Sequence, residues 1–369
     1  MTTRAAGPIL ISVHTTKTRP VLVLAIGLCV AGISAPAAAE GESVGTFPTW
    51  EERWIHQLIN RARCDPQIEL AGCGVCAEAA CYEPAKPLTW AVELNRAARF
   101  HSANLTDSGC GMMHDSPCSL IADIDLLYPD SCDGSVSCAC VSGTASCAGG
   151  TDTWARIAMF DTIGFGENIA GSSSDPTTPF YLWLLEPTGN SACGFHPNAD
   201  NGHRYNILAD LAHVDSVGTG QSGSYVISDF GDGPDPGKIP SGSHYPRQAA
   251  TVEVWANWYD TAGPAAAAVN VGGVCNTMSL ERGTATNGAW MAEVSGVGSG
   301  CHRYYFEFLD SVGTSATYPT TGSLAIGAGA GCPDWDASRP SSCLMAPSQI
   351  FADGFESGST GLWSATVPQ

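Results

Sequence analysis

Cysteine crowding constrains the fold of this 369-residue chain more than any other feature of its sequence. Eleven of the 16 cysteines lie between Cys64 and Cys193, and only Cys29 precedes that stretch. In an oxidising compartment such a density indicates disulfides, whereas in the cytosol it would indicate metal binding or redox chemistry. The compartment therefore decides how these cysteines are interpreted.

The N-terminal residues predict export. A basic stretch that ends at Arg19 precedes an apolar core over 21–33, and three small residues follow at 37–39. This order is typical of a secretory signal peptide, and the core is too short to span a bilayer. We expect cleavage after Ala39, which removes residues 1–39 and makes the protein secreted or periplasmic. No later stretch is apolar for long enough to predict a transmembrane segment.

Removal of residues 1–39 leaves 15 cysteines, an odd number that leaves at least one thiol unpaired within a monomer. The pairs Cys73–Cys76 and Cys138–Cys140 have the close spacing of metal motifs. Neither is matched by a second pair and histidines at zinc-finger spacing, so we predict disulfides at both. The sequence leaves the disulfide pairing open.

Charge limits the partners of the chain. The formal net charge is −20, and loss of three basic and no acidic residues from 1–39 makes it −23. Such an acidic surface repels nucleic acid and anionic lipid, so we expect no nucleic-acid partner. Solubility is the simplest role for this charge, with cationic partners or divalent ions as alternatives.

Two segments of the first half have helical periodicity. Trp54, Leu58 and Ala62 share one apolar face at i, i+4 and i+8. A second helix is predicted over 91–105, with His101 on its inward face. A lone histidine in such a position is most often a buried hydrogen-bonding group of the core, so we interpret His101 as structural.

Strand patterns appear towards residue 230. A short helix is predicted over 154–160, a weak strand over 214–218, and a stronger strand over 224–230, where β-branched and aromatic residues precede a glycine. Helices and strands in separate clusters along the sequence indicate an α+β layered domain.

The segment 123–150 has no periodicity and is rich in Cys, Ser, Gly and Asp. It predicts a disulfide-stapled surface insertion. A calcium loop built from Asp123, Asp125, Asp130 and Asp133 is an alternative, although their spacing differs from the ligand order of an EF-hand.

A second domain is predicted beyond a Gly-, Asp- and Pro-rich linker at 232–237. Short strand-like runs follow at 250–258, 266–271, 289–294 and 302–308. We interpret them as a small β-sandwich of immunoglobulin-like or fibronectin-like type over 238–327, stapled by Cys275 and Cys301, with a structural or adhesive accessory role.

The last predicted region, 328–369, is a cysteine-stapled segment with a tail. The tail from Phe351 to Gly358 resembles short tails at the ends of exported bacterial proteins, and a disordered acidic tail is the alternative.

Several strings in the first half resemble one family. Gly166-Glu167-Asn168-Ile169-Ala170 and Gly202-His203-Arg204-Tyr205-Asn206-Ile207-Leu208 are similar to the signature of the CAP superfamily, the SCP-like extracellular domain of cysteine-rich secretory proteins, antigen 5 and pathogenesis-related 1-like proteins. Further matching strings occur in the same order as in the family: Leu58–Arg63, Pro87–Trp90, His101-Ser102 and Tyr225–Gly231. The resemblance covers about 49–231 and implies a three-layer α-β-α sandwich.

The resemblance also implies a pit lined by two histidines and two glutamates. These four residues are His114, Glu167, Glu186 and His203. The two imidazoles are candidate ligands of a divalent metal, with zinc the most natural choice for nitrogen donors, and the carboxylates either complete the shell or orient water. The residues that support the pit structurally are predicted to be His101, Asn168 and Arg204.

Three functions are compatible with such a pit. The first is an exported binding module that holds a metal and, like family members, an apolar or sterol-like ligand, with an extracellular protein as a further candidate partner. The second is a peptidase-like hydrolase that uses the metal or the carboxylate–histidine pairs. The third is a polar network that only braces the fold. We favour the binding module, because the first domain has no Gly-x-Ser-x-Gly nucleophile motif.

Overall fold

The computed structural model describes residues 47–171, 175–196, 201–329 and 331–344. The predicted signal peptide and the tail beyond residue 344 lie outside the described residues. Within the described part of the chain, no helix is both long and apolar enough to cross a membrane.

Helix α1 (Trp50–Cys64) begins at a capping box. The Thr49 side chain accepts a hydrogen bond from the Glu52 backbone N–H, and the Glu52 carboxylate accepts one from the Thr49 N–H. Trp54, Leu58 and Ala62 are buried, as the periodicity predicts. The sequence predicted burial of one apolar face only, but every residue of α1 except Glu51 is buried, so the polar side chains of the helix are buried as well.

One mixed sheet forms the centre of the first half. Its strands, in the order in which they pair, are β1 (Thr89–Trp90), β3 (Ser216–Ser222), β4 (Tyr225–Gly231) and β2 (Gly164–Gly171). Only β1 and β3 are parallel, and β2 is an edge strand. The α+β prediction is confirmed, and the predicted strand at 224–230 corresponds to β4.

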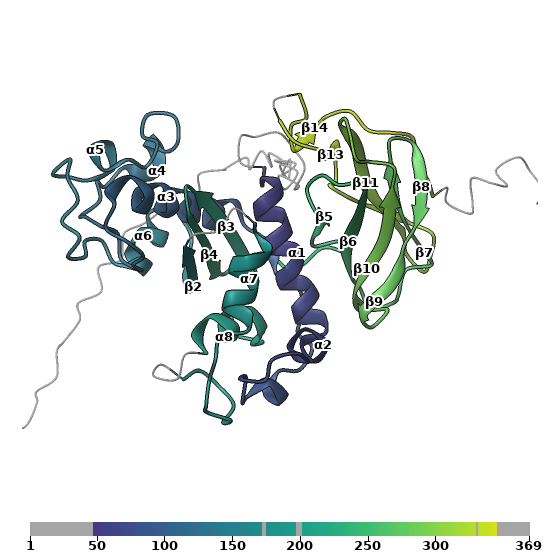
Figure 1. The fold of residues 1–369 in the computed structure, drawn as a ribbon, viewed down its shortest axis with the longest axis horizontal. Helices are drawn as coiled ribbons and strands as arrows, with labels where there is room; N and C mark the ends of the chain where they lie inside the picture. Colours follow the sequence, from purple (N-terminus) through teal and green to yellow (C-terminus); the bar gives the residue numbers. More distant parts are fainter. Residues whose placement is uncertain (1–46, 172–174, 197–200, 330, 345–369) are drawn as a thin grey trace, which may run out of the picture. The chain divides into compact units, whose positions relative to one another are not determined.

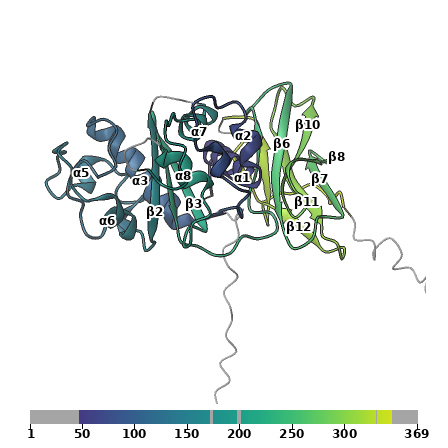
Figure 2. The same cartoon turned by 90° about the horizontal axis from the view of Figure 1, so that it is seen from below.

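Helices cover both faces of this sheet (Figure 2). Helix α3 (Val92–Ser108) packs on one face, where Ala98 and Leu105 contact Ile169 and Ile227. Its backbone comes so close to β3 that a Cβ at Gly218 would lie 2.0 Å from the backbone N of Asn95. A glycine is therefore required at that point of the strand.

The opposite face is covered by α1, α7 (Thr177–Leu184) and α8 (Gly202–Leu208) (Figures 1 and 2). Their apolar side chains form one cluster with Val217, Val226 and Phe230 of the sheet. Because the side chains of a strand alternate between faces, β4 supplies Val226 and Phe230 to this cluster and Ile227 to the α3 side.

The cysteine-rich insertion is more ordered than its sequence suggests. It contains α4 (Ile124–Leu127) and α5 (Val136–Ala139), and is followed by α6 (Thr153–Ala158), close to the helix predicted there. It is not only a surface insertion, because Ile124 and Cys132 are buried in a cluster with Phe100 of α3. The insertion has few apolar residues and they follow no regular spacing, so the sequence did not predict this packing. The short elements α2 (Pro66–Leu70) and a 3-10 turn at Ala79–Cys81 lie in the earlier cysteine-rich loop.

The second half contains two antiparallel sheets that pack around one apolar cluster. The first sheet has the order β5 (Gly242–Tyr245), β6 (Thr251–Tyr259), β10 (Asn287–Ser295) and β9 (Ser279–Gly283). The second has the order β14 (Trp335–Asp336), β13 (Ser323–Ile326), β11 (His302–Leu309), β7 (Ala266–Val271) and β8 (Val274–Thr277), with β12 (Ser315–Tyr318) also paired to β11.

The four strands predicted here correspond to β6, β7, β10 and β11. The sequence analysis did not predict five further strands in this region, because each has only four or five residues, too few for an alternation to stand out. They are β5, β8, β9, β12 and β13. Strand β14 pairs with β13 although it lies beyond the predicted end of the sandwich at 327.

Seven disulfides join the described residues and close loops of very different length. They are Cys73–Cys76, Cys81–Cys193, Cys110–Cys147, Cys118–Cys140, Cys132–Cys138, Cys275–Cys343 and Cys301–Cys332. Disulfides at both close pairs are confirmed, although Cys138 and Cys140 belong to different bridges. Cys275 and Cys301 each form a disulfide with a cysteine of the segment after residue 327.

Helix α1 also contacts the sandwich through buried polar groups. Gln57 Nε2 donates to Asn257 Oδ1 at 2.7 Å, and Ser241 Oγ donates to Gln57 Oε1 at 3.0 Å. Trp54 stacks on Tyr245 with ring centroids 5.2 Å apart. The predicted linker at 232–237 forms no helix or strand, and the two segments that it joins share a buried surface.

Cys64 should be the single thiol of the protein that lacks residues 1–39. It is buried and unpaired, and burial raises the pKa of its thiol to about 12. We expect less than a tenth of a thiol per chain to react with a chromogenic disulfide reagent in the native state, and about one after denaturation without reductant. Several reactive thiols in the denatured, non-reduced protein would contradict the disulfide assignment.

Gln57→Ala should destabilise the protein by about 1–3 kcal/mol, because it removes two buried hydrogen bonds and leaves Ser241 Oγ and Asn257 Oδ1 with only their long mutual contact of 3.4 Å. Urea unfolding measures this loss. Gln67→Ala is the matched control: Gln67 is exposed and donates to the backbone carbonyls of Ala79 and Tyr82, and we expect a smaller loss there. Equal losses in the two variants would show that the buried network at α1 contributes nothing special.

Candidate functional site

The candidate site lies at the free edge of the mixed sheet. Strand β2 carries Glu167 and Asn168 as neighbours, so their side chains point to opposite faces of the sheet. Glu167 lies on the face covered by α3, and Asn168 on the face covered by α8. The edge therefore meets helices and loops from both layers.

The first histidine–carboxylate pair is His114 with Glu167. His114 Nδ1 lies 2.8 Å from Glu167 Oε1. Arg156 of α6 forms an ion pair with Glu167 Oε2 and donates to the backbone carbonyl of His114 at 2.6 Å. One buried guanidinium thus holds the carboxylate and the loop that carries the histidine.

The second pair is His203 with Glu186. His203 Nδ1 lies 2.6 Å from Glu186 Oε2, and the backbone N–H of Arg204 donates to Glu186 Oε1 at 3.0 Å. The Arg204 side chain is fully buried and donates through Nη1 to the carbonyls of Leu184 and Glu186, both at 2.7 Å. Arg204 therefore fixes the backbone that carries Glu186.

Asn168 ties the second pair to the sheet. Its Nδ2 donates to the carbonyl of His203 at 3.1 Å, and its Oδ1 accepts from Asn206 Nδ2 at 2.9 Å. Asn206 packs so closely on β2 that a Cβ at Gly166 would lie 2.7 Å from its side chain. In the sequence Gly166-Glu167-Asn168, the glycine thus lets Asn206 approach the strand, and the next two side chains point to opposite faces of the sheet.

A pocket of about 430 Å³ brings the two pairs together. All four residues predicted for the pit line it, and the sequence analysis did not foresee the rest of the wall. The other lining residues are Thr153, Trp154, Phe165, Gly166, Phe195, His196, Gly202 and Asn206. Trp154, Phe165 and Phe195 are exposed aromatic side chains, so the mouth of the pocket is largely apolar.

Charge is distributed unevenly beneath His114. Burial acts to raise the pKa of Glu167, but the Arg156 charge and the hydrogen bond from His114 hold it below the usual value. Asp229 lies directly opposite Glu167 in the β2–β4 ladder and is fully buried. Burial and the neighbouring Glu167 charge raise the pKa of Asp229 well above its usual value. Arg156 and His114 thus favour the ionised form of Glu167, and burial beside that charge favours the protonated form of Asp229.

His101 lies beneath this pair as a core residue. Its Nε2 lies 3.0 Å from the carbonyl of Met113, next to His114. Burial and the Arg156 charge lower its pKa to about 3, so the ring is neutral. His101 thus positions the loop of His114 and does not line the pocket.

Sequence reasoning missed Arg156 and Asp229. A carboxylate within the apolar strand 224–230 could have marked Asp229 as unusual. Its position opposite Glu167, however, depends on how β2 and β4 pair, which the sequence does not show. Arg156 carried no such signal, because a single arginine in a short helix is usually solvated.

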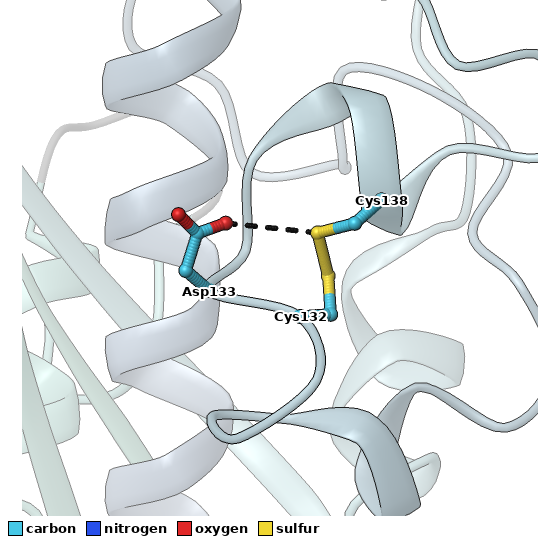
Figure 3. A group of neighbouring side chains, drawn as sticks. All are labelled: Cys132, Asp133 and Cys138. Carbon is cyan, nitrogen blue, oxygen red and sulfur yellow. Dashed lines mark hydrogen bonds between the residues drawn. A yellow bond between two sulfur atoms is a disulfide. The ribbon is translucent and has the colours of Figure 1, made fainter.

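Possible metal ligands other than the tetrad are few in the described ranges. Within them, one set of three His, Cys, Asp or Glu side chains has all its ligand atoms within 4.8 Å of one another, namely Cys132, Asp133 and Cys138 (Figure 3). Cys132 and Cys138 are joined in a disulfide, so neither offers a thiolate, and Asp133 alone is no metal site. Asp133 is the only member of the proposed calcium loop in that set.

Comparison with known proteins gives little further information. No protein-family model and no curated protein matches this chain. One solved structure, an extracellular protein containing an SCP domain from Bacillus anthracis str. Ames, matches with a TM-score of 0.28 and 19% identity. That match covers 50% of this chain and 40% of the other chain. The interpretation of the site therefore rests on its own residues and geometry.

Acid should destabilise the protein steeply. Burial lowers the pKa of His56 to about 4, and of His101 and His244 to about 3. Below pH 6.5 these side chains take up protons in the unfolded chain but not in the folded one, so stability is present above that pH and is lost as pH falls. Asp229 opposes this, because burial and the Glu167 charge raise its pKa and favour the protonated carboxyl in the folded chain.

The three histidines account for a difference of almost three protons between pH 5.5 and 4.5, from which Asp229 subtracts, so the free energy of unfolding should fall by about 2–4 kcal/mol over that unit. Urea unfolding across this range measures it. His101→Gln should reduce the slope by about 1.4 kcal/mol per pH unit. An unchanged slope in His101→Gln would contradict the buried neutral state of His101.

Proposed function

We propose that the chain is an exported protein whose residues 49–231 form a CAP-like binding module, with a zinc ion held by His114 and His203. Helices on both faces of the mixed sheet support the α-β-α sandwich of that family, and the many disulfides support export. The β-sandwich is then an accessory domain of immunoglobulin-like or fibronectin-like type.

The observation that carries this proposal is the orientation of the two imidazoles. In each pair the carboxylate lies against Nδ1, so Nδ1 carries the proton of the neutral ring and Nε2 keeps its lone pair. No described residue forms a hydrogen bond with either Nε2. A carboxylate behind a metal-binding histidine is the usual arrangement at zinc sites, because it fixes the tautomer and makes the ring more basic.

The donor set fits zinc but is incomplete. Two neutral imidazole nitrogens suit zinc, which prefers four ligands. Across the described residues, the tetrad does not bring three ligand atoms within 4.8 Å of one another, so Glu167 and Glu186 orient the histidines and do not complete a shell. Water or a group of the ligand would occupy the remaining positions, and zinc would polarise that group.

An apolar ligand is supported by a second pocket of about 600 Å³ beside the first. Met112, Ile169, Leu182 and Tyr225 contribute to its wall, and Glu186 and His203 line both pockets. A molecule with an apolar body in the second pocket would therefore place a polar end near His203. This continuity favours a small apolar ligand as the partner.

The electrostatics argue against a hydrolase that uses Glu167. A general acid or base at neutral pH works best with a pKa near 7, and Arg156 holds the pKa of Glu167 below its usual range. Glu186 is held by its hydrogen bonds to His203 and to the Arg204 backbone. We therefore favour binding over catalysis.

Zinc titration calorimetry and metal analysis of the dialysed protein test the proposal. We expect one zinc per chain, and His203→Ala should weaken binding at least 100-fold while the fold survives. Glu186→Gln should weaken it about 10- to 100-fold, because the ring loses its orienting partner. Glu186 is preferred to Glu167 for this test, because Glu167→Gln would leave Arg156 buried without its counter-ion.

His302→Ala is the control, since His302 lies in the sandwich, and its zinc affinity should equal that of the wild type. Zinc affinity should fall as the pH is lowered, because only a neutral imidazole can bind the metal. Absence of zinc binding in the wild type, with His203→Ala strongly destabilised, would mean that the tetrad only braces the fold.

A further inference from the structure

The disulfide Cys73–Cys76 differs from the others in its loop and its surroundings. It closes a loop of only three residue steps directly after α2, so it restricts the unfolded chain less than any longer bridge. Cys73 is partly exposed, and the two residues after it are exposed. Cys76 is buried, with 7% of its surface accessible. Cys73 is therefore the more accessible of the two cysteines.

A buried guanidinium contacts the inner sulfur. Arg204 Nη1 lies 3.1 Å from Cys76 Sγ. The other edge of the same group is held by Glu78, which accepts from Nε at 2.8 Å, and both side chains are fully buried. The pairing with Glu78 fixes the guanidinium, so its Nη1 group cannot turn away from the sulfur.

We propose that Cys73–Cys76 is a thiol–disulfide exchange site whose partner is a dithiol. A thiolate of the partner attacks Cys73 Sγ, forms a mixed disulfide with Cys73 and expels Cys76 as a thiolate. The second thiol of the partner then attacks the partner's first sulfur, which is bonded to Cys73 in the mixed disulfide. This forms the partner's disulfide and releases Cys73, which takes up the proton of the second thiol. Two electrons pass from the dithiol to the protein, and the reverse reaction oxidises the dithiol.

Arg204 explains why Cys76 is the leaving group. Exchange is faster when the departing thiolate is stabilised, and a neighbouring arginine stabilises a thiolate by charge and by its N–H donor. Glu78 neutralises part of the charge, and the two N–H groups of Nη1 are shared among Cys76 Sγ and the carbonyls of Leu184 and Glu186. Attack on Cys73 also agrees with access, because Cys76 Sγ is covered.

The backbone around the pair does not depend on the disulfide. Thr188 N–H donates to Val75 O at 2.9 Å, Ala77 N–H donates to Thr188 O at 3.3 Å, and Cys73 N–H donates to Leu70 O at 2.9 Å. The longer bridge Cys81–Cys193 anchors the same loop. These contacts keep the two sulfurs close after reduction, so the bond can form again.

Cys110–Cys147 is the internal control. It joins a partly exposed to an exposed cysteine, so it is more accessible than Cys73–Cys76, and no basic side chain among the described residues donates to either sulfur. Exposure alone would make Cys110–Cys147 react first, whereas the arrangement at Arg204 predicts the reverse order.

The experiment equilibrates the native protein, lacking residues 1–39, with mixtures of reduced and oxidised dithiothreitol, blocks free thiols with N-ethylmaleimide and maps them by mass spectrometry. Cys73–Cys76 should be half reduced at a ratio of reduced to oxidised reagent at least ten-fold lower than Cys110–Cys147, and should re-form when the ratio is reversed. Reduction of Cys110–Cys147 first, or of both together, would overturn the proposal.

Two single variants test the direction of attack without altering Arg204. With oxidised glutathione, Cys76→Ser should form a mixed disulfide at Cys73, whereas Cys73→Ser should form at least ten-fold less, because Cys76 is covered. Equal yields in the two variants would contradict the assigned roles. Neither measurement uses a metal, so failure of the exchange site and failure of the zinc proposal are separate results.

Discussion

The burial of α1 on nearly all sides is the constraint on which the rest of the structure depends. Because little of this helix faces solvent, its polar side chains need hydrogen-bond partners elsewhere in the protein. Arg63 donates to the carbonyls of Lys86, Ile207 and Ala209. His56 and Asn60 both contact the carbonyl of Leu88, just before β1. The polar side chains of α1 therefore fix the start of the sheet and the end of α8, the helix that carries His203.

Each histidine–carboxylate pair has a buried arginine behind it. Arg156 holds Glu167 and the backbone of His114, and Arg204 holds the backbone of Glu186 and the loop of Cys76. Charges buried in this way are stable only when they are paired and hydrogen-bonded. Arg156 thus compensates the charge of Glu167, whereas Arg204 pairs with Glu78 and supports Glu186 only through its backbone. The same device connects the second pair to a disulfide that lies outside the pit.

Sequence patterns predicted those parts of the fold in which local signals and tertiary packing agree. Strands β6, β7, β10 and β11 are long enough to alternate, and α3 has its apolar side chains at helical spacing. Helix α7 was missed because Phe180, Trp183 and Leu184 are apolar around much of a short helix, so no period stands out. Motif resemblance located the four pit residues, which line one pocket. It could not locate Arg156 and Asp229, whose roles arise only from the register and packing of separate elements.

The edge position of β2 has a mechanical consequence for the pit. His114 is attached to the layer on the α3 side of the sheet, and His203 to the layer on the α8 side, and the two layers meet at β2, the last strand of the sheet as far as the described residues show. Both rings are tied to this one strand, His114 through Glu167 and His203 through Asn168. An ion or ligand that touches both rings would therefore join two layers of the domain through adjacent residues of a single strand.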